Sequence, residues 1–449
     1  MVEELRLKYK DNEFMLAKLD HYIERLPLWM QSVEEDHIKK VSEKHELQQK
    51  RDEFVIEFFK RYEFYYIVSS DTYVQRIDQE WRIVREYDIV HILNQHISKE
   101  LSLSRYKLIH SILKRVKDTP LYSSATPYTT TMIVHQIPMR KEYAKFFLTI
   151  VGDILLNKKI NEVYYIDSSY KQFLKYVYQE VYRLTQKSIC DVFKYKYHDH
   201  RYENCRILYG KCSAFKECCM FDFINAAVHL STKYGSSETY IHHPESVIQH
   251  EVLFLTRHTP ETLLQYFLDT HTIPTPEKHI TYKDMFFLWK IFLKQKGLPF
   301  VITHQNFKTL LTSLGKCEAD MCMHCSPSTQ ADILKIKHFW DTHIQSDDNE
   351  YELNEIVMLY TQHEKTTLSV DILKDMIVLE YPAVSIHGDT VSNITCSLWN
   401  KTDDLDMLRD LCKEKNIVGI QCMYDFYEKY PFKYHVSKEY FEQYFISLA

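Results

Sequence analysis

Three cysteines between positions 317 and 325 have the residue type, and part of the spacing, of a zinc site. Cys322 and Cys325 are separated by two residues, and Cys317 precedes them. Two thiolates at that spacing can reach one Zn²⁺, but a structural site is closed by four Cys or His ligands. The remaining cysteines form no second pair at this spacing. We therefore expect a cysteine-bearing surface loop and no bound cofactor, with zinc binding as the alternative.

A second group of chemically active side chains lies in the stretch HHPESVIQHE, which contains His242, His243, His250 and Glu251. A metallohydrolase helix places two histidines one turn apart, and this stretch does not. The chain has 23 histidines, so chance clusters are expected. We interpret these residues as structural or exposed, and we assign no catalytic residue. An enzyme with a dispersed or zinc-dependent site is the third-ranked alternative.

The spacing of the glycines excludes two large classes of nucleotide-binding protein. The chain has 7 glycines, and the nearest two, Gly297 and Gly315, are 18 positions apart. A phosphate-binding P-loop needs two glycines five positions apart, and the dinucleotide fingerprint needs three within six. The chain is therefore not a P-loop helicase, ATPase or GTPase, and we expect it to be non-enzymatic.

One stretch of the chain, Tyr164 to Lys211, interleaves aromatic and basic residues. Its 48 residues include ten tyrosines and nine Lys or Arg against five acids, although the whole chain has a net charge of -6. Proteins that bind single strands use cations for the phosphates and aromatic rings for the bases. The alternative is a pair of helices with tyrosines in the core and lysines in solvent. The expected nucleic-acid-binding residues are Lys194, Tyr195, Lys196, Tyr197, Arg201, Tyr202 and Arg206.

The N-terminal stretch KYKDNEFMLAKL has apolar residues at helical spacing. It resembles a motif found in scaffold subunits of the cap-binding translation initiation complex and in their inhibitors. These proteins use the motif to bind the cap-binding protein. That motif is Tyr, four residues, Leu and an apolar residue. Tyr9 takes the tyrosine position, Met15 takes the apolar position, and Phe14 replaces the leucine. The resemblance implies partner binding through Tyr9, Phe14, Met15 and Leu16, by a helix in a groove. The alternative is an amphipathic helix that packs on its own protein.

A broader resemblance covers most of the chain. YEFYYIVSSDTYVQRI, EYAKFFLTIVGDILLNKK, YHDHRYENCRIL, FFLWKIFLKQKGLP and VSKEYFEQYF are similar to segments of a conserved uncharacterised protein of giant cytoplasmic DNA viruses. FFLWKIFLKQKGLP and the tail are also similar to segments around the helicase core of viral helicase-primases. The resemblance implies a viral protein of nucleic-acid machinery, located in the host cytoplasm or viral factory. It supplies no catalytic residues.

The elements that must position these residues are predicted to be mainly α, within an α+β fold. A small strand-containing insertion is expected near 60–87, and a mixed α/β module at the C-terminus. Pro27 is expected to break the N-terminal helices, and SDDNEYELNE is expected to be an acidic spacer. The longest apolar runs are too short to span a bilayer. The predicted regions are 1–50 (N-terminal helical, partner-binding), 51–230 (helical with a short β-hairpin module), 231–345 (helical) and 346–449 (small α/β).

The leading hypothesis is a non-enzymatic viral scaffold of translation initiation. Its expected partners are a cap-binding protein, an RNA helicase of the initiation complex, and single-stranded nucleic acid, expected to be RNA. The alternative is an accessory factor of the viral DNA replication machinery, which would bind DNA or a helicase-primase.

Overall fold

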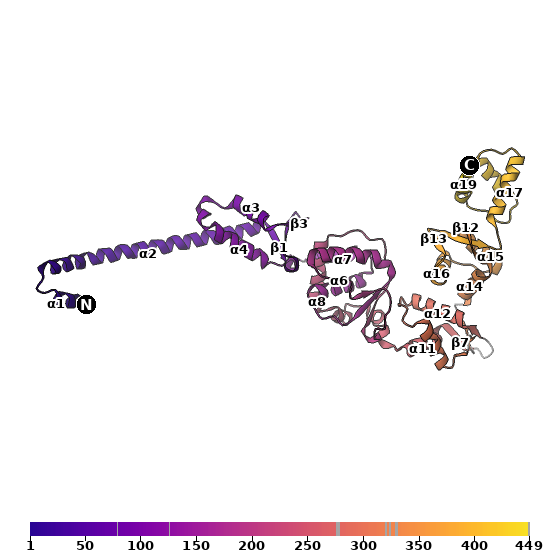
Figure 1. The fold of residues 1–449 in the computed structure, drawn as a ribbon, viewed down its shortest axis with the longest axis horizontal. Coiled ribbons are helices and arrows are strands. Elements are labelled where there is room, and N and C mark those ends of the chain that lie inside the picture. The colour runs from indigo at the N-terminus through magenta and orange to yellow at the C-terminus, as the bar shows by residue number, and fades with distance from the viewer. Residues whose placement is uncertain are drawn as a thin grey trace. The chain divides into compact units, whose positions relative to one another are not determined.

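The computed structural model describes residues 1–78, 80–124, 126–274, 279–318, 321–322, 325–327 and 331–447. It is 63% helical, with nineteen α-helices in these ranges and several small sheets (Figure 1). This confirms the predicted mainly α, α+β fold class. No helix in these ranges is long and apolar enough to cross a membrane.

Contacts within the chain divide it into two compact units. Unit 1 comprises Met1–Lys194 and Leu208–Val252, and unit 2 comprises Tyr195–Ile207 and Leu253–Ala449. The predicted division into four regions is finer than this one and stays a prediction.

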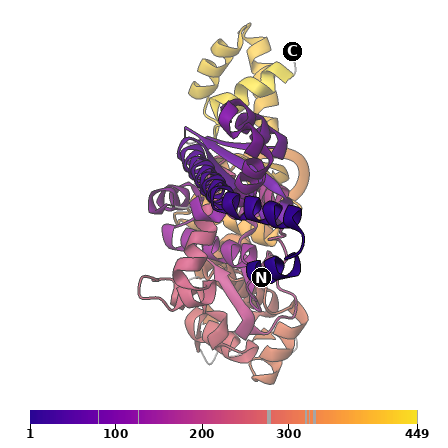
Figure 2. The same ribbon diagram turned by 90° about the vertical axis from the view of Figure 1, so that its left-hand side faces the viewer.

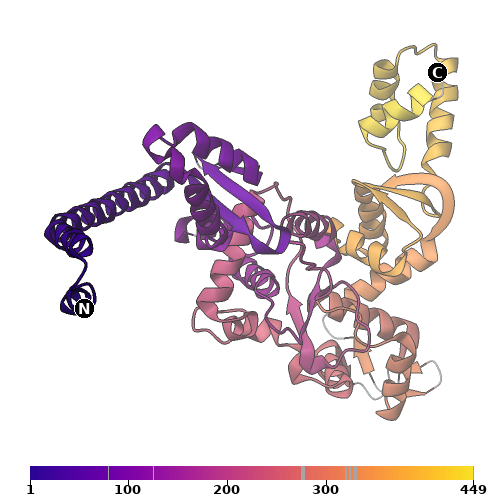
Figure 3. The same ribbon diagram turned by 60° about the vertical axis from the view of Figure 1, so that its left-hand side comes forward.

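Unit 1 begins with a short helix, α1 (Val2–Lys8), and a 49-residue helix, α2 (Glu13–Arg61). The Asn12 side chain caps α2 by accepting from the main-chain N–H of Met15. Glutamine–carboxylate pairs four residues apart support its exposed turns. In Figures 1 and 3, α2 extends alone beyond the helices at its C-terminal end. The predicted break at Pro27 is wrong, because α2 continues through it. The helix is exposed there, so water can satisfy the carbonyl that lacks a main-chain partner.

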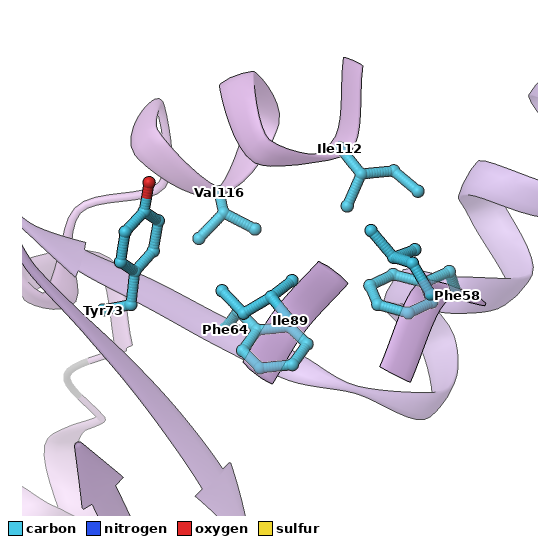
Figure 4. Packing of buried hydrophobic residues seen from close by; sticks show 7 residues of the cluster. Phe58, Phe64, Tyr73, Ile89, Ile112 and Val116 are labelled. Carbon is cyan, nitrogen blue, oxygen red and sulfur yellow. The ribbon is translucent and has the colours of Figure 1, made fainter. Parts of the chain in front are cut away.

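The C-terminal end of α2 is anchored in a small mixed module. Strands β1 (Glu63–Ile67), β2 (Thr72–Ile77) and β3 (Glu80–Val84) form an antiparallel sheet. Two helices, α3 (Glu86–His96) and α4 (Arg105–Lys117), complete the module. The strands lie where the sequence predicted the insertion. The buried core, shown in Figure 4, consists of Phe58, Phe64, Tyr73, Ile89, Leu93, Ile112 and Val116.

The rest of unit 1 is built around two helices that pack closely. A Cβ added at Gly152 would lie 2.1 Å from the main-chain oxygen of Ala227, so glycine permits this approach. Strand β4 pairs with β5 in parallel. The elements are α5 (Pro127–Gln136), α6 (Lys141–Leu155), β4 (Val163–Ile166), α7 (Lys171–Thr185), β5 (Phe193–Lys194), α8 (Met220–Tyr234), α9 (Ser237–Ile241) and α10 (Gln249–Val252). Strand β6 (Cys205–Leu208) lies at the boundary between the units.

Unit 2 contains a helical part with an aromatic core. Trp289 on α12 contacts the rings of Phe267 and Phe307, and all three side chains are buried. The start of α11 at Thr259-Pro260 and the end of α12 before Gly297 are as the sequence predicted. The elements are α11 (Pro260–His271), β7 (Thr272–Pro274), β8 (Ile280–Thr281), α12 (Tyr282–Gln295), α13 (His304–Ser313), β9 (Cys317–Glu318), β10 (Met321–Cys322) and β11 (Cys325–Pro327).

The C-terminal part of unit 2 mixes helices with a three-stranded sheet of order β12-β14-β13. The predicted acidic spacer is wrong, because its residues form most of β12 and the start of α15. Pairing with β14, distant in sequence, fixes this strand. The elements are α14 (Ala331–His343), β12 (Ile344–Glu352), α15 (Leu353–Glu364), α16 (Val370–Glu380), β13 (Ser385–His387), β14 (Thr390–Cys396), α17 (Lys401–Glu414), α18 (Ile420–Lys429) and α19 (Lys438–Ser447).

Candidate partner and nucleic-acid surfaces

The four residues of the N-terminal motif do not share one exposed surface. Helix α1 turns back beside the first turns of α2 (Figure 2), and Arg6 Nη2 donates to Asp20 Oδ1 at 2.6 Å. Tyr9 ends α1, and Phe14 lies in the first turn of α2. Phe14 is 70% exposed, whereas Tyr9, Met15 and Leu16 are half-buried. A partner that used all four would therefore have to open the α1–α2 hairpin.

A larger apolar surface lies further along α2, where the sequence analysis assigned no site. Between residues 24 and 46 every side chain of the helix is exposed. The large apolar residues here are between 46% and 70% exposed. At 3.6 residues per turn, five of them fall within about 120° of arc. We call this surface the exposed stripe, and its members are Leu26, Trp29, Met30, Val33 and Val41. Their helical spacing in the sequence is the signal that could have identified it.

The exposed stripe continues a helix face that is buried elsewhere. Phe54, Phe58 and Phe59 lie on the same side of α2 and pack into the core of the β1–β3 module. The helix therefore buries one end of its apolar face in its own protein and exposes the other. The exposed stripe is therefore a candidate interaction surface.

The seven predicted nucleic-acid-binding residues between Lys194 and Arg206, which we call the basic and aromatic segment, are only partly exposed. Lys194 is half-buried in unit 1, and the other six residues belong to unit 2. Tyr195, Lys196 and Arg201 are exposed, and Tyr197 is half-buried. The expectation of exposure is wrong for Tyr202 and Arg206, which are buried.

Local and distant hydrogen bonds explain why these two residues are buried. The Tyr202 hydroxyl donates to the main-chain oxygen of Val301 at 3.3 Å, and burial raises the pKa of Tyr202. Arg206 Nη1 donates to the main-chain oxygens of Glu203 and Cys205 at 2.6 and 3.2 Å. Neither side chain can reach a nucleic acid without leaving these partners.

A cavity of about 500 Å³ lies beside the segment in unit 2. Tyr197 and the exposed ring of Phe300 both line it, and such rings can stack on bases. The carboxylates of Asp199 and Glu261 also line the cavity, and they repel phosphate. The cavity therefore suits a neutral base better than the strand backbone.

The predicted zinc candidates are brought partly together. Cys317 and Cys322 are opposite each other in the β9–β10 pair, and both are buried. Cys325 begins β11, but its side chain lies outside the described part of the structure. Among the side chains that the structure describes, no group of three could hold a metal ion. The expected surface loop is wrong for Cys317 and Cys322, because both are buried in paired strands, and zinc binding stays an untested alternative.

Two residues of the stretch HHPESVIQHE, His242 and Glu251, have contacts that stabilise the fold. His242 Nδ1 is 2.8 Å from the Gln249 side chain. Glu251 accepts from Arg140 at 2.6 Å and from the Tyr143 hydroxyl at 2.7 Å. Burial, followed by the Glu251 carboxylate, raises the pKa of Tyr143. These contacts join the start of α6 to α10, in agreement with the interpretation of these residues as structural.

Two consecutive helices of unit 2, α15 and α16, are joined by a connection from Lys365 to Ser369. In helix-turn-helix proteins that bind DNA, the second of two consecutive helices lies in the major groove. Here residues 331–396 contain twelve Asp or Glu against four Lys or Arg. Moreover, Asp375 and Glu380 of α16 pair with Lys294 and Lys290 of α12, at 2.6 and 2.7 Å. This negative, occupied surface would repel the phosphates of duplex DNA.

Comparison with known proteins returned no matching family model, no similar curated protein and no similar solved structure.

Proposed function

We propose that this protein is a non-enzymatic adaptor that holds a protein partner through the N-terminal region of α2. The observation that carries the proposal is the exposed stripe. Only Phe58 is buried among the 49 residues of α2. The part of α2 between residues 24 and 46 is exposed all round, so it gains little from its own fold and is stabilised when a partner covers its apolar face.

The energetics favour such a complex. Complete burial of a large apolar side chain contributes about 1.5–3 kcal/mol. Members of the exposed stripe retain about half of their surface in solvent, so covering them adds about 1 kcal/mol each. A few such residues at the centre of an interface can supply most of its affinity.

The specific partner favoured by the spacing of Tyr9, Phe14 and Met15 is a cap-binding protein. Phe14 is available as the first anchor, and the exposed stripe follows it on the same helix. In unit 2, Tyr195, Lys196 and Arg201 provide an exposed aromatic and cationic group for single-stranded RNA. The adaptor would thus join an initiation factor to RNA without performing chemistry on either.

The test is titration of the full chain with purified cap-binding protein by calorimetry. The double variant Trp29→Ser and Met30→Ser should weaken binding at least tenfold, and Phe14→Ala should weaken it less. The control is Leu28→Ser, because Leu28 is even more exposed than Trp29 and Met30 but lies on the opposite side of α2. Equal losses in the control and the double variant would contradict a role for the stripe. Stripe-dependent binding to a helicase-primase instead would favour the replication alternative.

A further inference from the structure

A cavity of about 200 Å³ in unit 1 has a mainly apolar surface, but three lysines and a histidine are among its lining residues. It lies among helices α5, α6 and α8, away from the exposed stripe. The titratable groups that line it, apart from Tyr234, are Lys141, Lys145, His229 and Lys233. In the part of the chain that the structure describes, no carboxylate is among the lining residues. A cavity lined in this way attracts anions.

Neither Lys141 nor Lys145 forms an ion pair within the described residues, whereas Lys233 Nζ lies 3.6 Å from Glu245. Lys145 nevertheless interacts with Glu245, because its ammonium group adds to the effect of the Tyr234 hydroxyl and of Lys233 in lowering the pKa of that carboxyl. Lys141 is also the first residue of the 15-residue helix α6, whose N-terminus adds a partial positive charge. The positive potential therefore comes from several independent groups.

The third lysine is held at one side of the cavity by a small network. Lys233 Nζ lies 3.1 Å from the Tyr234 hydroxyl, which donates to Glu245 at 2.8 Å. The Tyr234 hydroxyl, followed by the Lys233 ammonium, lowers the pKa of the Glu245 carboxyl. Glu245 therefore stays ionised and competes with any anion for Lys233.

The two threonines at the cavity contribute shape rather than donors. The Thr130 hydroxyl donates to the main-chain oxygen of Thr126 at 3.0 Å, and that of Thr131 donates to Pro127 at 2.9 Å. Recognition must then come from the ammonium groups. Lysine acts as a point charge and binds phosphate without demanding a planar ligand.

We propose that this cavity binds a phosphate group, either of a free nucleotide or of the 5′ end of a single-stranded nucleic acid. Pockets that enclose a whole drug-sized ligand measure about 300–1,000 Å³, so this one accommodates the phosphate and little more than the adjoining sugar. The rest of the ligand lies outside. The site is separate from the surface of the proposed adaptor function.

The test compares three probes on the full chain by fluorescence anisotropy: labelled ADP, a 5′-phosphorylated oligonucleotide and the same oligonucleotide with a 5′ hydroxyl. The triple variant Lys141→Gln, Lys145→Gln, Lys233→Gln should lower affinity for a phosphate probe at least tenfold. The matched control removes three exposed lysines of unit 1 elsewhere, at Lys99, Lys107 and Lys114.

Preference for ADP identifies a nucleotide site, and preference for the 5′-phosphorylated strand over the 5′-hydroxyl strand identifies an end-binding site. Failure of the wild-type chain to bind any probe would overturn the proposal, as would equal losses in the triple variant and the control. Melting by circular dichroism establishes that both variants fold.

A second variant acts in the opposite direction. Glu245→Gln keeps an acceptor for the Tyr234 hydroxyl but removes the charge that competes for Lys233. It should tighten binding of the preferred probe about two- to fivefold, which a general loss of folding cannot do. Unchanged affinity would overturn the assignment of Lys233 to the site.

Discussion

The two ends of α2 have the same kind of apolar face in different surroundings. Near the C-terminal end, Phe54, Phe58 and Phe59 pack against strands and helices of their own module. Near the N-terminal end, Trp29 and Met30 lie on the same side of the helix and are more than half exposed. Periodicity is alike at both ends, so it identifies the face but not what covers it. The difference can be tested on each end separately.

The largest effect is expected where the face is buried. Phe58→Ala removes a ring that contacts Phe54, Phe59 and Phe64, so it should lower the free energy of unfolding of the β1–β3 module by about 3–5 kcal/mol. Met30→Ala should change it by no more than about 0.5 kcal/mol, because the side chain has little to lose. Urea titration followed by circular dichroism measures both. A comparable loss in Met30→Ala would mean that the stripe is already covered in solution.

A smaller effect is expected at Pro27, which lies within the exposed region of α2. Proline in a helix interior costs about 3 kcal/mol relative to alanine, since it removes one N–H donor and crowds the preceding turn. Pro27→Ala should therefore slow amide exchange around Pro27 by up to about 100-fold, equivalent to about 2.7 kcal/mol. Amides near Phe58 should be unchanged. Unchanged exchange around Pro27 as well would indicate that a contact already holds this stretch.

The same contrast explains what could be predicted from the sequence. The fold class, the start of α11 and the end of α12 were predictable, because Thr259, Pro260 and Gly297 act on the chain locally. The continuation of α2 through Pro27 and the strand β12 were not, since one depends on the neighbouring turns and the other on pairing with β14. Local sequence signals predict the elements of the fold that do not depend on contacts with residues distant in sequence.

For the candidate sites, the sequence did not indicate which side chains would be buried. Tyr195 and Tyr202 belong to one basic and aromatic pattern, yet Tyr195 is exposed and Tyr202 is hydrogen-bonded to Val301, 99 positions away. The anion-binding cavity was equally hidden, because Lys141 and Lys233 are distant in sequence and are brought together by the packing of α6 on α8. The residue types in the sequence indicated which side chains could bind a ligand. Which of them lie together on one surface could be learned only from the tertiary structure.

The smallest effect is expected at the free end of the hairpin, where α1 contacts α2. The ion pair between Arg6 and Asp20 is short, at 2.6 Å, but its side chains are 54% and 51% exposed. Solvent screening limits such a pair to about 0–1 kcal/mol. Arg6→Ala should therefore speed amide exchange in α1 by no more than about fivefold, and 1 M salt should remove most of the difference. Arg25→Ala is the control, because Arg25 is exposed on α2 without an ion pair among the described residues. An effect of Arg6→Ala above about 2 kcal/mol would show that α1 is part of a core, and that the stripe begins on a rigid hairpin rather than on a helix that a partner can uncover.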